Sequence, residues 1–205
     1  PVTGNSALRL NALYSYQQPV TRFAGPVSSQ SDLDLRQYAF RAKYLWEPTT
    51  STSVYLIGEI TKSQGVAGFY DLTYRSLASD SANSAPLASV GIAAGPENFY
   101  AAGNAPFSRD LKTGGLQGTI SHTFDSGWAI SNIAAWKFYR LNQQIDGDST
   151  PVDGIDVNRN RTRFDQYTNE LRLTMPEHNA LSGQVGLFYY QSKTKTDFQI
   201  AGSNY

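Results

Sequence analysis

Apolar and polar residues alternate in several segments, most clearly in the stretch 167–175. Tyr167, Leu171, Leu173 and Met175 fall on one parity, and Thr168, Glu170, Arg172 and Thr174 fall on the other. Successive side chains of a β-strand point to opposite faces of its sheet. The pattern therefore predicts a strand with one apolar and one charged face. The short stretch 176–182 and the apolar-rich segment 183–191 predict its hairpin partner.

The alternation recurs along the chain and predicts about seven strands. Clean examples are the segments 8–16, 36–46 and 116–124. Two other segments are mixed. In 53–63, Tyr55 and Ile57 share a parity with Glu59, and in 128–139 Asn132 interrupts the apolar parity. A β-bulge that shifts the register is one explanation for the second segment.

Short and long connections alternate between these strands. The short ones are 47–52, 125–127 and 176–181, and the long ones are 17–35, 64–113 and 142–163. Compact soluble domains rarely contain several long loops, whereas outer-membrane barrels combine short periplasmic turns with long extracellular loops. The expected fold class is all-β, an antiparallel transmembrane β-barrel segment. Single-chain bacterial barrels have even strand numbers from eight upward, so about seven strands predict a fragment of a larger barrel.

Composition narrows the function classes. The formal net charge is zero, so a nucleic-acid partner is not expected. The absence of cysteine excludes disulfides, thiol catalysis and Cys-based metal sites. Asp146, Asp148, Asp153 and Asp156 lack the spacing of an EF-hand, and His122 and His178 lack metal-ligand spacing. We therefore expect no metal, no cofactor and no enzymatic activity.

A resemblance to a known family follows from two neighbouring motifs. The strand YTNELRLT (167–174) and the segment GLFY (186–189) resemble the mid-barrel signature of TonB-dependent outer-membrane receptors, and the likeness extends over about residues 114–195. It implies that residues 1–205 are part of a 22-stranded barrel in the bacterial outer membrane. It also implies a plug domain outside this chain, coupling through that plug to an inner-membrane TonB complex, and import of a small molecule such as a ferric siderophore.

One candidate set consists of charged residues on the polar parity of the strands. Charge is expensive in lipid, so these side chains are expected to face the barrel lumen. Two interpretations stay open: a hydrated wall of mutually paired charges, or contact with the plug. The set comprises Arg9, Arg41, Lys43, Glu59, Glu170 and Arg172.

A second candidate set lies in the long connections, where aromatic and arginine side chains can anchor ligands. The 64–113 connection contains Phe69, Tyr70, Tyr74, Phe99, Tyr100 and Phe107, of which the last three are the ligand-binding candidates. The 142–163 connection contributes Arg159, Arg161 and Arg163, which suit an anionic metal chelate. Self-packing of the loops, with local Arg–Asp pairs, explains the same residues.

Two further functions fit part of the pattern. A passive porin or a small outer-membrane barrel would share the strands and loops but lack a plug. A soluble β-sandwich that binds carbohydrate would instead pack its apolar strand faces into one core.

Overall fold

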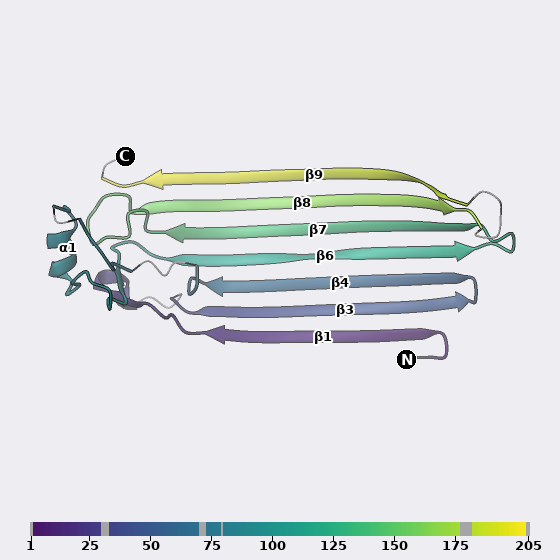
Figure 1. Cartoon of the computed structure of the whole chain (residues 1–205), viewed down its shortest axis with the longest axis horizontal. Helices are drawn as coiled ribbons and strands as arrows, with labels where there is room; N and C mark the ends of the chain where they lie inside the picture. Colours follow the sequence, from purple (N-terminus) through teal and green to yellow (C-terminus); the bar gives the residue numbers. More distant parts are fainter. Residues whose placement is uncertain (1, 30–32, 70–72, 79, 177–181, 204–205) are drawn as a thin grey trace.

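The computed structural model describes residues 2–29, 33–69, 73–78, 80–176 and 182–203. Within these ranges the dominant feature is one seven-stranded sheet with the order β1-β3-β4-β6-β7-β8-β9 (Figure 1). All neighbouring strands are antiparallel, so the predicted strand number and direction are confirmed. The strands are β1 (Ser6–Gln17), β3 (Leu35–Thr49), β4 (Thr52–Gly65), β6 (Ser108–Thr123), β7 (Ala129–Ile145), β8 (Val157–Thr174) and β9 (Gln184–Ala201).

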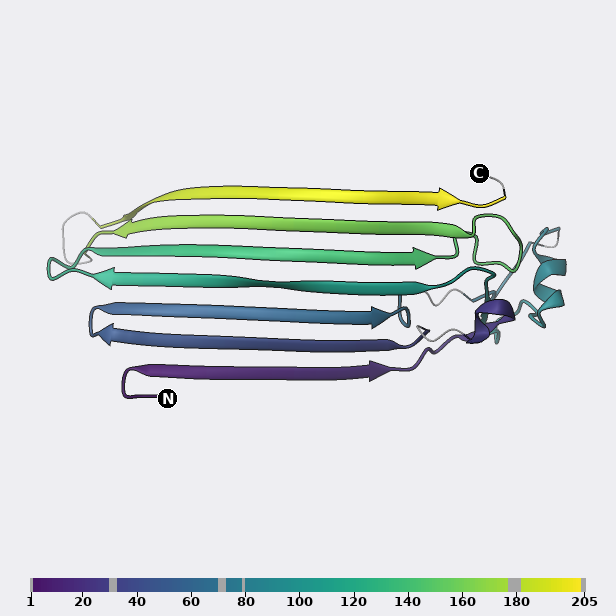
Figure 2. The same cartoon turned by 180° about the vertical axis from the view of Figure 1, so that it is seen from behind.

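The remaining elements gather at one end of the sheet, where the long connections lie (Figures 1 and 2). They are β2 (Arg22–Ala24), the 3-10 helix η1 (Gly25–Ser29), α1 (Ser84–Ser89) and β5 (Tyr100–Ala102). We call this assembly, with the segments that connect it, the loop layer. None of the helices in the described ranges is long and apolar enough to cross a membrane.

The loop layer contains the buried apolar core of the chain, in two clusters. One consists of Val27, Leu33, Val66, Phe107 and Ile145, and the other of Tyr74, Leu87, Ile92 and Ala102. Most large apolar side chains of the sheet are exposed or half-buried, and its buried ones, Leu35 and Ile145, lie at the ends of β3 and β7 next to the loop layer. No second sheet covers it among the described residues, where the only other sheet is the parallel pair β2–β5. The soluble β-sandwich alternative is therefore wrong.

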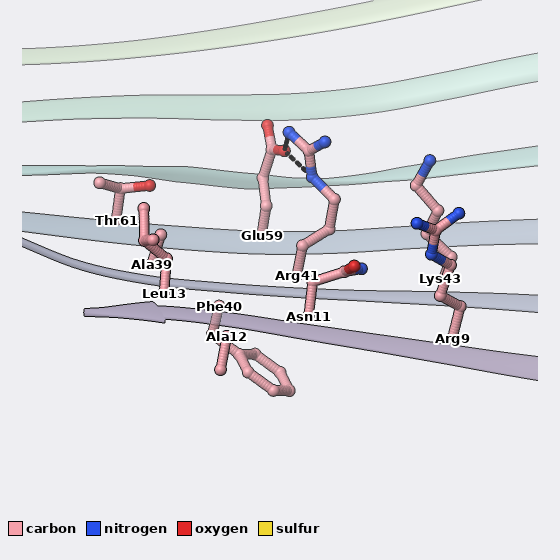
Figure 3. A pocket seen from close by; sticks show the side chains of 10 residues that line it. All are labelled: Arg9, Asn11, Ala12, Leu13, Ala39, Phe40, Arg41, Lys43, Glu59 and Thr61. Atoms are coloured by element: carbon pink, nitrogen blue, oxygen red, sulfur yellow. Dashed lines mark hydrogen bonds and ion pairs between the residues drawn. The ribbon is translucent and has the colours of Figure 1, made fainter. Parts of the chain in front are cut away.

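The pairing register gives the sheet two chemically distinct faces. Directly paired residues share a face: Phe40 pairs with Ala12 and Ile60, whereas Arg41 pairs with Glu59. Figure 3 shows Phe40 and Ala12 pointing away from the side on which Arg41 and Glu59 lie. We call the side of Phe40 the apolar face and the side of Arg41 the charged face. The alternation predicted for residues 36–46 and 167–175 is thus present in the structure.

The limit of the apolar face toward the loop layer runs diagonally across the strands. The last large apolar residues before that limit are Tyr16 on β1, Tyr38 on β3, Ile60 on β4, Phe138 on β7 and Tyr189 on β9. Tyr189 is in register with Leu8, eight residues before Tyr16 on the opposite edge strand. With about 3.4 Å per residue and about 4.8 Å between strands, this limit is inclined by about 40–45° to the hydrogen-bond direction. Membrane barrel strands tilt by about the same angle, roughly 35–45°.

The strands toward the C-terminus are longer than the sequence predicted. β7 has 17 residues, and β8 and β9 have 18 residues each. A tilted membrane strand needs only about 9–11 residues to cross a bilayer. These strands therefore continue past the apolar face toward the loop layer, and the connection predicted as 142–163 is reduced to residues 146–156.

Asn132 occupies the apolar face without any shift of register. The pairing of β7 with β6 and β8 is continuous around it, so the bulge proposed for 128–139 is wrong. The Asn132 side-chain amide instead exchanges hydrogen bonds with that of Asn169, with N···O distances of 3.0 and 3.2 Å. It also donates to the carbonyl oxygen of Glu170. The two amides satisfy each other's hydrogen bonds, which offsets the cost of placing two polar groups on the apolar face.

This pair gives a first prediction. Asn132→Leu alone leaves the Asn169 amide without its partner in lipid and is expected to lower the free energy of unfolding of the barrel by about 1 kcal/mol. Asn132→Leu combined with Asn169→Leu removes both polar groups and should recover the loss. Denaturant unfolding of the intact barrel from lipid vesicles measures both variants. If the double variant had a lower free energy of unfolding than the single variant, the pairing of the two amides would be contradicted.

Candidate functional site

The charged face carries an ion-pair network that spans four neighbouring strands. Arg41 on β3 donates to Glu59 on β4, with 2.9 Å between Nε and Oε2. Glu59 also binds the Nζ of Lys137 on β7, although β6 lies between the two strands. The β6 residue in register with both is Gly115, which has no side chain to intervene. A glycine in a central strand therefore allows a carboxylate to reach an ammonium two strands away.

Arg9 and Lys43 add positive charge beside this network. They are directly paired across β1 and β3, so two like charges lie side by side. Neither forms an ion pair within the ranges that the structure describes. With Arg41 and Glu59 they line a groove of about 340 Å³, in which their side chains lie on the same side of the sheet (Figure 3). This groove holds three cations and one carboxylate, a composition that suits a carboxylate from another segment or molecule.

The six residues predicted to face the lumen all lie on the charged face of the sheet. The structure does not bring all of them together. Glu170 and Arg172 lie on β8 and form a local pair, with distances of 2.6 and 2.8 Å between guanidinium nitrogens and carboxylate oxygens. The sequence analysis did not predict Lys137 as a charged-face residue. Its position between Trp136 and Phe138, which share the opposite parity, was the signal that could have indicated it.

The loop aromatics differ in how accessible they are. Phe99 is 42% exposed and lies under the Arg75 guanidinium, whose Cζ is 5.2 Å from the ring centroid. Tyr100 is likewise exposed, and Arg22 lies over its ring. Phe107 is only 3% exposed, so its assignment to the ligand-contacting surface is corrected: it packs in the loop-layer core.

Three other aromatic residues of the 64–113 connection complete this comparison. Phe69 is exposed, and Cζ of Arg109 lies 3.8 Å from its ring centroid. Tyr74, like Phe107, is buried in the loop-layer core. Tyr70 lies outside the described residues, as does His178.

The arginine cluster is not in a loop. Arg159, Arg161 and Arg163 lie on β8, which begins at Val157, so their predicted location in the 142–163 connection is wrong. They share the apolar-face parity, since Arg163 is in register with Arg140, which follows Phe138 on that face. These arginines consequently point away from the charged face and from its groove. A strand that leaves the membrane loses its apolar parity, which is why this segment resembled a loop.

A buried carboxylate holds the loop layer together. Asp146 accepts four backbone N–H bonds: from Asn104 and Ala105 at 2.9 and 3.2 Å, and from Asp148 and Ser149 at 3.2 and 2.8 Å. These bonds join the end of the 66–107 connection to the 146–156 connection. In the described ranges, no group of three or more His, Asp or Glu residues is arranged to hold a metal ion.

Burial dominates the electrostatics of this anchor. It raises the pKa of Asp146 to about 6, against the amide donors, which favour the charged form. It also raises the pKa of Tyr74 to about 12, and the neighbouring charges of Asp146 and Asp148 act in the same direction. Tyr74 therefore stays protonated at neutral pH and donates to the carbonyl oxygen of Ser149. The side-chain hydrogen bonds of Asp146 and Tyr74 are made to backbone groups of the loop layer, so their role is structural.

Comparison with known proteins identifies the fold. No protein-family model and no curated protein matches the sequence. Among solved structures, the chain is similar to the ferric yersiniabactin uptake receptor FyuA from Yersinia pestis, with a TM-score of 0.64 and 13% sequence identity. The match covers 98% of this chain and 28% of the receptor, so the chain spans just over a quarter of that protein's length. The chain thus has the fold of an antiparallel transmembrane β-barrel segment of the kind found in an outer-membrane uptake receptor.

Proposed function

We propose that this chain forms part of the barrel domain of a TonB-dependent outer-membrane receptor that imports a nutrient such as a ferric siderophore. The observation that carries the proposal is the structural similarity to the ferric yersiniabactin uptake receptor over nearly the whole chain. The strand motifs at 167–174 and 186–189 point to the same family. In this role the protein is a transporter and not an enzyme, and the bacterial outer membrane is its location.

The two edges of the sheet support a larger barrel. β1 and β9 each have a neighbour on one side only within the described chain. In a bilayer every backbone N–H and C=O group must be paired within the protein. Further strands on both sides, up to the 22 of the receptor family, would meet this requirement. A plug domain outside this chain would then fill the lumen.

The charged face is the surface that such a plug would meet. Arg9 and Lys43 lack ion-pair partners among the described residues, and their groove has a surplus of positive charge. A plug carboxylate seated there would compensate that charge, whereas the network of Arg41, Glu59 and Lys137 is already paired. Among the loop candidates, Phe99 and Tyr100 remain accessible for a metal chelate that enters from the side of the loop layer.

Orientation in the membrane can be tested with single cysteines, because the chain contains none of its own. Ser84 in α1 and Ser126 in the turn between β6 and β7 are both exposed, at opposite ends of the sheet. On intact cells, Ser84→Cys should react with a membrane-impermeant thiol reagent and Ser126→Cys should not. Both should react after the outer membrane is permeabilised. Labelling of Ser126→Cys alone on intact cells would invert the topology.

Transport is tested with the full-length protein. Cells that express it should accumulate iron from a ferric siderophore in a saturable manner, and dissipation of the inner-membrane proton gradient or deletion of TonB should abolish the accumulation. Non-saturable, energy-independent uptake would instead support the porin alternative. If no siderophore supports uptake although the orientation test succeeds, the nutrient belongs to another chemical class.

A further inference from the structure

A row of cations crosses the apolar side of the sheet next to its loop-layer limit. The register aligns Lys62, Lys112, Arg140, Arg163 and Lys195 on the five adjacent strands β4, β6, β7, β8 and β9. In the same row, β1 and β3 carry Tyr14 and Tyr38, whose ring centroids are 5.1 Å apart. Because the apolar limit is diagonal and the row follows the register, the cations lie at different distances beyond the limit. Lys62 is two residues after Ile60 on β4, whereas Lys195 is six residues after Tyr189 on β9.

Positive charge is in clear excess in this region. We define the basic belt as the apolar-side cations at and beyond the apolar limit: Arg36, Lys62, Lys112, Arg140, Arg159, Arg161, Arg163, Lys193 and Lys195. Asp110, Asp165 and Asp197 are the carboxylates on the same side of these strand segments. The whole chain has no net charge, so the belt concentrates cations that are balanced elsewhere.

Part of the belt is available to a ligand. Arg140 binds both carboxylate oxygens of Asp165, at 2.6 and 2.7 Å, and Lys62 lies 3.8 Å from Asp110. By contrast, no ion pair is found for Lys112, Arg163 or Lys195 in the described part of the chain. Lys112, Arg140, Arg161 and Arg163 line a groove of about 740 Å³ on β6, β7 and β8, together with the carboxylates Asp110 and Asp165. Four cations against two carboxylates leave the groove basic.

A second groove on the same strands is apolar. It has a volume of about 410 Å³ and is lined by Leu116, Trp136, Tyr167 and Tyr189, which precede the basic groove in the direction of the short turns. The two grooves together match an amphiphile, with hydrocarbon against the apolar groove and an anionic group against the basic one. An apolar groove beside the cations favours a lipid over a free anion.

We propose that the basic belt binds the phosphate groups of an anionic lipid in the leaflet on the loop-layer side. Lys112, Arg163 and Lys195 supply the unpaired cations for charge-assisted hydrogen bonds to phosphate oxygens. The acyl chains lie along Leu116, Trp136 and Tyr167. This inference depends on the apolar face lying in the membrane and is independent of which nutrient is transported.

The test compares two matched pairs of cations. Arg163 and Lys195 are directly paired on the apolar side, and Arg9 and Lys43 are directly paired on the charged face. Arg163→Gln with Lys195→Gln should weaken binding of diphosphoryl lipid A to the full-length protein in detergent by on the order of tenfold. Arg9→Gln with Lys43→Gln removes the same charge and should leave binding within about twofold of wild type, as expected for cations on the face turned away from lipid. Native mass spectrometry of retained lipid measures both.

Three further measurements bear on the proposal. Dephosphorylated lipid should bind equally well to the wild-type protein and to the Arg163/Lys195 variant. Added salt should weaken the binding of the phosphorylated lipid only. Folding of the double variant is checked by its heat-dependent migration in gels. If it does not fold, Lys112→Gln on β6 should weaken lipid binding independently. Equal losses in both cation pairs would overturn the proposal. Displacement of the lipid by inorganic phosphate at the same concentration would also overturn it, because the site would then select a free anion.

Discussion

Leu116→Arg is expected to lower the free energy of unfolding of the barrel in lipid by about 1–2 kcal/mol, between the cost of a lipid-facing arginine at the bilayer midplane and its cost at the interface. Leu116 belongs to the apolar run of β6 and is 61% exposed on the apolar face. Its side chain therefore contacts lipid rather than a protein core. The expected loss arises from moving a charge into hydrocarbon, and little of it from lost packing within the protein.

Gln117 provides the matched control. It is the next residue of the same strand, and it lies on the charged face in register with Ile57 and Ala135. Gln117→Arg keeps the new charge on the hydrated side, with Glu59 on the neighbouring strand, and should change stability by no more than about 0.5 kcal/mol. Denaturant unfolding from lipid vesicles, followed by tryptophan fluorescence, measures both variants. Similar losses at the two positions would mean that the two faces have been assigned the wrong way round.

The residues on each face of the sheet could be predicted from the sequence, because the alternation of side chains along a strand is a local property. A period of two residues places Glu170 and Arg172 opposite Leu171 and Leu173 whatever the neighbouring strands are. Since one side of the sheet must meet lipid, the parity with charge had to be the other side. The connections were found at the correct ends of the strands for a similar reason, because turn-forming residues interrupt the periodicity.

The ends of the strands could not be predicted from the sequence in the same way. From Arg159 to Arg163 the sequence has polar residues on both parities, because β8 has left the membrane there and neither side requires apolar residues. Only the pairing with β7 and β9 shows that the segment is a strand. The consequence for function is substantial, since three arginines assigned to ligand capture belong to the basic belt on the lipid side.

Contacts between distant strands were also invisible in the sequence. Glu59 and Lys137 are 78 residues apart and meet only because Gly115 is in register with both. The burial of Phe107 likewise depends on Val27 from η1 and Ile145 from the end of β7. Neither a periodicity nor a motif encodes such a meeting, because it follows from the register of the whole sheet and the packing of the loop layer.

Gly115→Ala is expected to destabilise the barrel by about 1–3 kcal/mol, the usual cost of forcing extra volume into a closely packed site. A Cβ atom at Gly115 would lie 2.2 Å from the carbonyl oxygen of Trp136 and 2.7 Å from Cδ of Lys137. The first contact involves backbone, so β6 and β7 must move apart locally. The second displaces the side chain that reaches Glu59, so the ion pair should weaken together with the strand pairing.

Gly118→Ala on the same strand separates this effect from the general consequence of replacing glycine. A Cβ atom there would meet only Leu56, at 3.4 Å, which is an ordinary contact on the apolar face. Because alanine loses less backbone entropy than glycine on folding, this variant should be neutral or more stable by up to about 1 kcal/mol. Unfolding from lipid vesicles compares the two. If Gly115→Ala were tolerated as well as Gly118→Ala, the close approach of β6 and β7 at Gly115 would be wrong, and the route from Glu59 to Lys137 across β6 would no longer require a glycine.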